Sequence, residues 1–348
     1  MRKFIQIFFS FLFIQISYLC GSKSDVNVFD HNISASKSPK NAFQIPIRDQ
    51  IGPPILDILR RGLKDAIISK ADIVILDMDT PGGELGVTLE IMQEIIESFD
   101  RFDGSIITYV NREAISAGAY IAIATNEIAF APYAQIGAAE AVSGGGGNID
   151  SSMKRKVNSY LKAKIRSYSG NYRYRSRVMG SMMDANETLL IDGKPPLAAD
   201  GSIIQKEGEL LTLTAEEAVR QYGDPPQPLL GIGIYETIET LLDEKFGVGN
   251  YKLSKMEINW AEKVGLWLNS IGPIIIGIGL LGLFIEFKTP GFGFFGIAGI
   301  VFVLIFFGSK YVSGLAGQEE ILVFLLGVSL VVLELFLFPG LIFPAIIG

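Results

Sequence analysis

The sequence predicts an α/β domain with a largely parallel sheet, followed by a membrane domain. Two observations support the first part of this prediction. Short apolar runs alternate with helix-like segments from about residue 43 to residue 250, and most of these runs end at turns that contain Gly or Pro. A third observation supports the second part, because residues from about Val264 onward are almost continuously apolar.

Residues 1–24 are predicted to form a signal peptide or an uncleaved N-terminal anchor. Met1, Arg2 and Lys3 supply a positively charged start, and an apolar stretch follows from Phe4 to Cys20. Residues 25–42 are rich in Ser, Asn and Lys, which predicts a linker. If the signal directs export, the domain over residues 43–250 lies outside the cytoplasm.

The elements of the α/β domain follow from hydrophobic periodicity and from helix-start signals. The predicted strands are 43–47, 73–78, 105–110, 127–132 and 134–137, with shorter pieces at 189–191, 202–204 and 210–213. One predicted helix begins at the Pro pair 53–54. The other predicted helices cover 85–99, 119–125, 151–169, 214–222 and 235–246. The helix over 214–222 begins with the capping-box pattern of Thr214 and Glu217.

Residues 264–348 are predicted to form a multi-pass membrane domain of about three helices. The candidate spans are 267–287, 292–307 and 321–338, and the second is short for a bilayer that takes about 20 residues to cross. A Glu followed by a Pro-Gly turn occurs after the first span and again after the third, at Glu286 and Glu334. Both are interpreted as polar residues at helix ends near the membrane interface.

The candidate chemistry centres on Ser116. This serine follows a predicted strand and begins a helix of small residues, where unpaired backbone N–H groups favour a developing negative charge. The Gly82-Gly83 pair ends the preceding strand and can turn backbone N–H groups toward the same point. This pattern predicts a hydroxyl nucleophile beside an oxyanion hole.

Elimination predicts a lysine as the general base. The chain has one histidine, His31, and it lies in the polar N-terminal segment far from any predicted core element. The one cysteine, Cys20, lies in the N-terminal apolar stretch, so neither a cysteine nucleophile nor a Cys/His metal site is expected. A basic helix over 151–169 carries Lys154, Lys156, Lys162 and Lys164, which makes a Ser-Lys dyad the expected arrangement.

The chain resembles the NfeD (nodulation formation efficiency D) group of membrane-bound serine proteases, in the ClpP/crotonase superfamily. The resemblance covers about residue 43 to the end. It rests on residues 79–83 (DTPGG), 116–120 (SAGAY), 131–132 (AP), 136–139 (IGAA) and 208–218 (GELLTLTAEEA), and on Glu286 with the turn 290–293 (PGFG).

The resemblance implies a ClpP/crotonase-like ββα protease domain with Ser116 as nucleophile and Lys156 as base. Lys154 is the runner-up base, because one sequence does not fix the register of a helix, whereas Lys162 and Lys164 are expected to be solvated. Gly82 and Gly83 are implied to form the oxyanion hole. The lysine must be neutral to accept a proton, so the Gly-rich loop 143–148 and the start of the basic helix are expected to order over the site when a peptide binds.

The expected activity is ATP-independent cleavage of hydrophobic segments of membrane-associated proteins. No phosphate-binding P-loop motif is present, no cofactor or metal is expected, and the formal net charge of −7 argues against a nucleic-acid partner. The resemblance implies a stomatin- or prohibitin-like partner and a homo-oligomer, most simply a dimer. A catalytically inactive membrane scaffold of the same fold is the main alternative. An acyl-CoA hydratase or isomerase is a lesser one, with Glu113 and Glu140 as its only nearby acidic residues.

Overall fold

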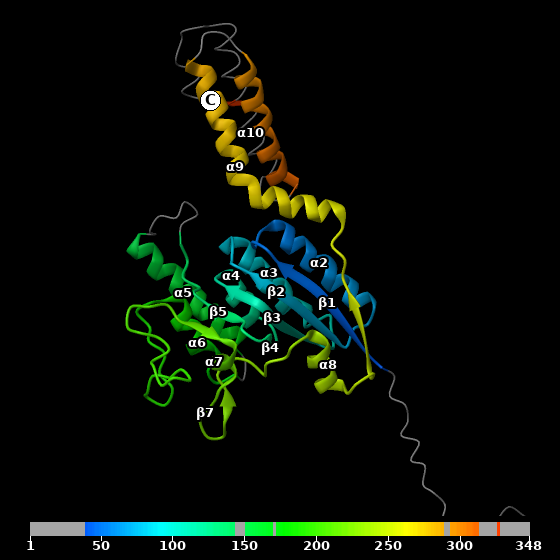
Figure 1. The fold of residues 1–348 in the computed structure, drawn as a ribbon, viewed down its shortest axis with the longest axis vertical. Coiled ribbons are helices and arrows are strands. Elements are labelled where there is room, and N and C mark those ends of the chain that lie inside the picture. The colour runs from blue at the N-terminus through cyan, green and yellow to red at the C-terminus, as the bar shows by residue number, and fades with distance from the viewer. Residues whose placement is uncertain (1–38, 143–149, 170–171, 289–292, 313–325, 328–348) are drawn as a thin grey trace, which may run out of the picture. The chain divides into compact units, whose positions relative to one another are not determined.

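The computed structural model describes residues 39–142, 150–169, 172–288, 293–312 and 326–327 (Figure 1). The predicted signal or anchor over 1–24, most of the linker over 25–42, and the Gly-rich loop lie outside the described residues. Within them, one main sheet has the strand order β6-β5-β3-β2-β1-β9, with β4 beside β3. All its strand pairs are parallel except β5 with β6, which confirms the expected α/β class. The strands are β1 (Lys40–Arg48), β2 (Ile73–Thr80), β3 (Ser105–Ile115), β4 (Glu127–Phe130), β5 (Gln135–Gly137), β6 (Thr212–Thr214) and β9 (Tyr251–Lys255).

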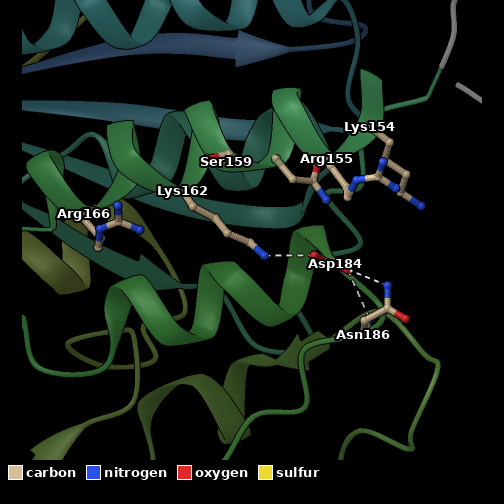
Figure 2. A pocket seen from close by; sticks show the side chains of 8 residues that line it. Lys154, Arg155, Ser159, Lys162, Arg166, Asp184 and Asn186 are labelled. Carbon is tan, nitrogen blue, oxygen red and sulfur yellow. Dashed lines mark hydrogen bonds and ion pairs between the residues drawn. The ribbon is translucent and has the colours of Figure 1, made fainter. Parts of the chain in front are cut away.

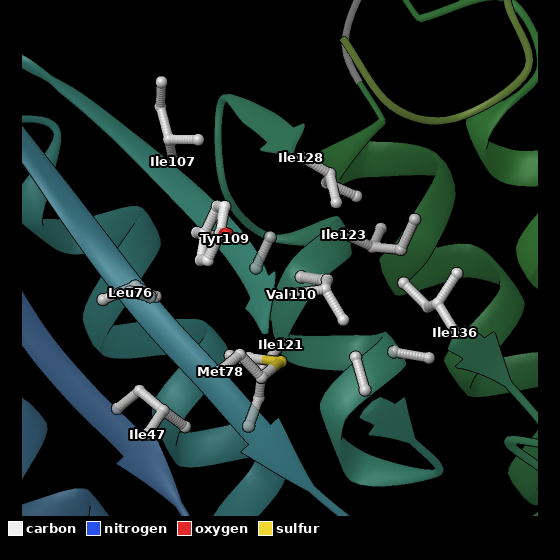
Figure 3. Packing of buried hydrophobic residues seen from close by; sticks show 14 of the residues in the cluster. Ile47, Leu76, Met78, Ile107, Tyr109, Val110, Ile121, Ile123, Ile128 and Ile136 are labelled. Atoms are coloured by element: carbon white, nitrogen blue, oxygen red, sulfur yellow. The ribbon is translucent and has the colours of Figure 1, made fainter. Parts of the chain in front are cut away.

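Helices α2, α3 and α4 cover one face of the sheet. The register sets Ile45 beside Leu76 and Ile47 beside Met78, and all four belong to one buried cluster. Figure 3 shows part of this cluster, including Ile47, Leu76 and Met78. Gly62 of α2 lets Ile45 pack close, since a Cβ there would lie 2.7 Å from Ile45 Cδ1. The helices of the domain are α2 (Pro53–Ile68), α3 (Leu85–Ser98), α4 (Ala117–Ile123), α5 (Ser151–Tyr168), α6 (Arg175–Met183), α7 (Ala215–Val219) and α8 (Ile238–Phe246).

The buried strand β2 carries a carboxylate on the other face of the sheet. Asp77 is 3% exposed, and it accepts hydrogen bonds from Gln44 Nε2 at 2.9 Å, Arg48 Nη2 at 2.6 Å and Asn111 Nδ2 at 3.1 Å. These donors come from both neighbouring strands and satisfy the charge that burial would otherwise destabilise. An acidic residue inside an apolar run is therefore compatible with a central strand here.

Several elements differ from the sequence-based expectation. The strand-like pieces at 189–191 and 202–204 are wrong as strands, because each contributes only an isolated bridge, Ile191 with Lys194 and Leu197 with Ile203. Helix α6, strand β9 and a small hairpin of β7 (Gln221–Tyr222) and β8 (Gln227–Pro228) were not expected. The capping box at Thr214 and Glu217 is confirmed, with both of its hydrogen bonds formed.

Two apolar helices follow the α/β domain, α9 (Trp260–Lys288) and α10 (Phe294–Val312). Helix α9 is long and apolar enough to cross a membrane, whereas the apolar part of α10, Phe294–Ser309, is shorter. The two helices pack closely at glycines, since a Cβ on Gly279 would lie 2.8 Å from Val303 Cγ2. Nearly all of the third candidate span, 321–338, including Glu334, lies outside the described residues.

Glu286 lies in the last turn of α9, at the helix end where the sequence places it, and it is buried between these two helices. Its carboxylate accepts hydrogen bonds from the backbone N–H groups of Gly293 at 2.5 Å and Gly296 at 2.9 Å, at the start of α10. It therefore caps the N-terminus of the following helix across the turn.

Candidate active site

Ser116 lies in a strained backbone conformation where β3 meets α4. Its φ of 53° and ψ of −112° lie outside the regions that a residue with a side chain normally adopts. Such a conformation costs on the order of 1–3 kcal/mol and persists only when its surroundings impose it. The constraint comes from β5, because the Ser116 N–H donates to the carbonyl of Gly137 at 2.9 Å. Within the described residues the Ser116 hydroxyl makes no hydrogen bond, and the residue is only partly buried.

Gly82 lies directly against Ser116. Its φ of +116° favours glycine, and a Cβ there would lie 2.6 Å from Ser116 Cβ and 3.1 Å from its Oγ. The Gly82 N–H donates to the Thr80 hydroxyl at 3.1 Å, so this amide is already engaged. The absence of a side chain at Gly82 therefore lets the backbone pack against Ser116, but the N–H of Gly82 is not free to donate to a substrate.

Gly83 is held in place by Ile51, and its own amide stays available. The Ile51 N–H donates to Gly82 O at 2.8 Å and the Glu84 N–H donates to Ile51 O at 3.0 Å, while a Cβ on Gly83 would collide with the backbone of Ile51. In the described part of the chain, the N–H of Gly83 has no acceptor. Of the two predicted oxyanion-hole glycines, Gly83 has the amide that is free to donate.

Sequence reasoning missed a second backbone donor, Ala117. It is the first residue of α4 and is 3% exposed, and its N–H makes no hydrogen bond to any described residue. Helix α4 has seven residues, so its macrodipole is small and its first amides act as individual donors. Its place in the sequence could have identified Ala117, because the residue directly after a nucleophile on a sharp turn commonly donates its backbone N–H to the oxyanion.

The chain after β5 forms the next wall of the site. The Ala139 N–H donates to Met182 O at 2.7 Å, and Ala139 O accepts a hydrogen bond from the Tyr120 hydroxyl at 3.1 Å. Burial raises the pKa of Tyr120 strongly, and the nearby negative charge of Glu140 adds to the effect. Tyr120 therefore stays a neutral donor and fixes this wall to α4.

Helix α5 carries the candidate bases, and its register separates them. Asn158, Leu161 and Ile165 form its buried face, and Lys154 lies on that same face because residues four apart are neighbours on a helix. The Nζ of Lys154 lies 2.7 Å from Glu140 Oε1. Lys156 is exposed and lies about 160° around the helix from Lys154, given 100° per residue. Among the described residues, neither lysine forms a hydrogen bond with Ser116.

The expectation that Lys162 is solvated is wrong. Its Nζ is 2.9 Å from Asp184 Oδ2 and 2.7 Å from Glu187 Oε1, and its side chain is 22% exposed. Lys164 lies 5.6 Å from the ring centroid of Tyr168. Lys162 thus ties α5 to the segment that follows α6.

A polar cavity of about 580 Å³ lies between α5 and the end of α6. Figure 2 shows Lys162 pointing across it to Asp184. The Oδ1 atom of Asn158 is buried and accepts no hydrogen bond from described residues. The cavity is lined by Lys154, Arg155, Asn158, Ser159, Lys162, Arg166, Asp184 and Asn186.

Arg175 of α6 positions the far end of α4. The residue is 2% exposed, and its guanidinium donates to the carbonyls of Ile123 at 3.2 Å, Thr125 at 2.8 Å and Asn126 at 3.2 Å. Burial lowers the pKa of Arg175 to about 10, while Tyr172, whose ring centroid is 3.8 Å away, favours the charged form. The cation satisfies carbonyls at the C-terminal end of the helix that Ser116 begins.

A family model described as the NfeD1b N-terminal domain matches residues 41–225, more than half of the chain. The chain belongs to the NfeD family. The NfeD integral membrane domain matches residues 270–348, which supports a membrane location. Among the described residues, no group of three His, Cys, Asp or Glu side chains could hold a metal ion.

Two curated relatives and one solved structure are similar to this NfeD family chain. Membrane protein NfeD1b of Bacillus subtilis (strain 168) is 34% identical over 319 residues, which are 89% of this chain and 65% of that protein. Membrane-bound protease PH1510 of Pyrococcus horikoshii is 23% identical over 309 residues, which are 74% of this chain and 60% of that protein. This chain therefore spans less than two thirds of the length of either relative.

The solved structure is the 1510-N membrane-bound stomatin-specific protease in complex with a substrate peptide. It matches 67% of this chain and 100% of its own chain, with a TM-score of 0.51 and 22% identity. This likeness confirms the predicted fold class, an α/β domain whose fold is shared with that structure and which is followed in this chain by an apolar helix.

Proposed function

We propose that this NfeD family protein is a membrane-bound, ATP-independent serine endopeptidase that cleaves hydrophobic segments of membrane-associated proteins. The observation that carries the proposal is the strained Ser116, with its side chain against Gly82 and with unengaged amides on the residues next in the chain, Gly83 after Gly82 and Ala117 after Ser116. Strain of this kind is retained where function requires it. The curated relative PH1510 is named a membrane-bound protease, which supports the same reaction class.

In the proposed mechanism, Ser116 Oγ attacks the carbonyl carbon of the scissile peptide bond. The N–H groups of Gly83 and Ala117 donate to the oxyanion that forms, and removal of one such donor in other enzymes typically costs a factor of 10²–10³ in kcat. A neutral lysine takes the hydroxyl proton and returns it to the leaving amine. An acyl-enzyme on Ser116 then reacts with water.

The proposed base is Lys156, with Lys154 as the runner-up. Lys156 would need α5 to move or rotate, because it lies on the outer face of that helix. Lys154 already lies on the inner face and would have to leave Glu140. In either case a bound peptide must enclose the amine, because a lysine surrounded by water stays charged.

The proposed surroundings of the enzyme follow from the family and from its relatives. The protease domain lies outside the cytoplasm, the chain crosses the membrane more than once, and the enzyme works as a homo-oligomer, most simply a dimer. A stomatin- or prohibitin-like protein is the proposed partner, in line with the name of the solved stomatin-specific protease.

The test uses the full chain in lipid vesicles with an apolar reporter peptide. Ser116→Ala should abolish cleavage, and so should the exchange of the base, Lys156→Ala. Lys164→Ala, on the same helix, should leave cleavage unchanged. If Lys154→Ala abolishes cleavage and Lys156→Ala does not, the base is Lys154. Undiminished cleavage by Ser116→Ala would remove the proposal.

One observation favours the alternative of a non-catalytic membrane scaffold. In the described part of the chain, neither candidate lysine forms a hydrogen bond with Ser116, and Lys154 is paired with Glu140. A fluorophosphonate probe separates the two functions, because a scaffold would leave Ser116 unlabelled even with a bound peptide.

A further inference from the structure

Helix α9 begins with an amphipathic stretch, Trp260 to Asn269, whose apolar side faces away from the protein. Trp260, Val264 and Trp267 are 78%, 43% and 60% exposed. Their spacing of four and then three residues places all three on one side of the helix. Two large aromatic side chains on one open helix face need an explanation, since soluble surfaces rarely gather them.

The opposite side of this stretch is fixed to the protease domain. Glu262 receives two hydrogen bonds from Arg61 of α2, at 2.7 Å from Nε and 2.8 Å from Nη2. Asn259 caps the helix reciprocally with Glu262, with N–H to side-chain oxygen distances of 2.8 and 2.9 Å. Leu266 packs on the domain core. The direction of the open face is therefore set by contacts and not by a free rotation of the helix.

The length of α9 exceeds what a bilayer core requires. Its 29 residues extend about 44 Å at 1.5 Å per residue, against a hydrocarbon core of about 30 Å. The excess of about 14 Å corresponds to roughly nine residues, which is the stretch up to Leu268. The match to the integral membrane domain begins at residue 270, at the same boundary.

Helix α9 also changes direction at this boundary. Figure 1 shows it running first over α2 and then turning to run alongside α10. Pro273 lies inside the helix, lacks an N–H and disfavours the straight continuation, which accounts for the bend. The stretch before the bend and the membrane span after it can thus take different angles to the bilayer.

We propose that the Trp260–Asn269 stretch lies flat in the headgroup region of the bilayer, with Trp260, Val264 and Trp267 inserted into the lipid surface. Tryptophan favours this region because its ring is apolar and its indole N–H is polar. Direct continuity with the membrane span brings this face to the lipid surface, which is the reason for choosing lipid as the occupant over a second copy of the chain.

This placement ties the candidate active site to the bilayer surface. Gly52 packs against Asn269 of this stretch, since a Cβ on Gly52 would lie 2.9 Å from Asn269 Nδ2. The preceding residue, Ile51, donates its N–H to Gly82 O and accepts a hydrogen bond from the N–H of Glu84, so it holds the Gly82-Gly83 turn. If the proposed protease function holds, the enzyme would cut apolar segments where they emerge from the membrane.

The experiment uses the fact that Trp260 and Trp267 are the two tryptophans of the whole chain. Their fluorescence therefore reports on this face alone. The full chain is reconstituted in phosphatidylcholine vesicles that carry bromine on the acyl chains, either near the headgroups or near the bilayer centre. We expect several-fold stronger quenching by the shallow bromines. Trp260→Phe and Trp267→Phe, each with one remaining tryptophan, should both give this pattern.

A control places a tryptophan elsewhere, with Val248→Trp in a chain that also carries both Phe exchanges. Val248 is 83% exposed and lies close to the start of β1, whose other end is about 27 Å away along the strand, and no lipid should quench a tryptophan there. Stronger quenching by deep bromines would place the tryptophans in the hydrocarbon core and overturn the proposal. Quenching by aqueous iodide alone would overturn it too, and so would protection from both quenchers, which indicates a protein cover. None of these readings requires proteolysis, so they are independent of the proposed function.

Discussion

The α-carbon of Gly82 faces the side chain of Ser116 so closely that a methyl group on Gly82 would lie 2.6 Å from Ser116 Cβ. A separation under 3.0 Å is one that real Cβ atoms do not tolerate, and the positive φ of Gly82 adds backbone strain to any exchange. The Thr-Pro-Gly-Gly turn and the serine therefore have to be considered as one unit.

Gly82→Ala should abolish peptide cleavage and lower the free energy of unfolding by about 2 kcal/mol or more, because of steric overlap and a positive φ. Chemical denaturation and the reporter-peptide assay measure the two effects. The matched control is Gly86→Ala in the first turn of α3, where a Cβ meets nothing within 4 Å. That exchange should stabilise the protein by about 0.5–1 kcal/mol and leave cleavage intact. Equal effects of both exchanges would contradict the close packing at Gly82.

Ser116→Gly and Ser116→Ala should both be inactive but should differ in stability. Glycine adopts a φ of 53° and a ψ of −112° with little strain, whereas alanine in the same conformation keeps the backbone strain of the wild type. The free energy of unfolding of the glycine variant, measured by denaturant titration, should therefore be about 1 kcal/mol higher than that of the alanine variant. This difference should remain even though glycine has the larger conformational entropy in the unfolded state. An alanine variant that is the more stable of the two would argue that the backbone at this position is relaxed.

Arg175→Ala should destabilise the domain by on the order of 3 kcal/mol, because three carbonyl groups at the end of α4 lose their donor inside the protein. Cleavage should fall as well, since the same helix begins at Ser116. Arg177→Ala, on an exposed position of α6, should change stability by less than about 0.5 kcal/mol. Thermal unfolding of both variants tests the difference, and an Arg175→Ala protein as stable as Arg177→Ala would refute the role given to this guanidinium.

The Lys162–Asp184 pair predicts a loss of stability in acid. Burial alone would raise the pKa of Asp184, but hydrogen bonds from Lys162 and Asn186 outweigh it and hold the pKa below 3.8. A carboxyl whose folded pKa is lowered contributes stability above its unfolded pKa, and this contribution disappears as the pH falls through the folded value. The stability difference between the wild type and Asp184→Asn should therefore be constant near neutral pH and shrink below about pH 4. Denaturation midpoints of the wild type and Asp184→Asn at pH 7 and pH 3 measure this difference. A stability difference that is equal at the two pH values would exclude the Lys162–Asp184 pair as its cause.

Local patterns in the sequence were sufficient for much of the fold. The apolar run that begins at Ile73 forms a central strand, and the Thr214 capping box begins a helix. The prediction failed where the pattern is weak or the partner is distant. Helix α6 is almost wholly buried, so it has no polar face for periodicity to detect, and β9 is an edge strand that forms only because β1 is beside it.

The candidate site divides in the same way. The sequence by itself determined that Ser116 and the glycine pair each follow a strand, and it supports the prediction of a lysine base, because both depend on residue type and local order. Only the tertiary structure decided that Gly83 and Ala117 are the amides left unengaged, that Lys154 faces inward while Lys156 faces outward, and that Arg175 anchors α4. The physical reason is that each of these depends on packing between segments far apart in the chain: β5 beside β3, Ile51 beside Gly83, and α6 beneath α4.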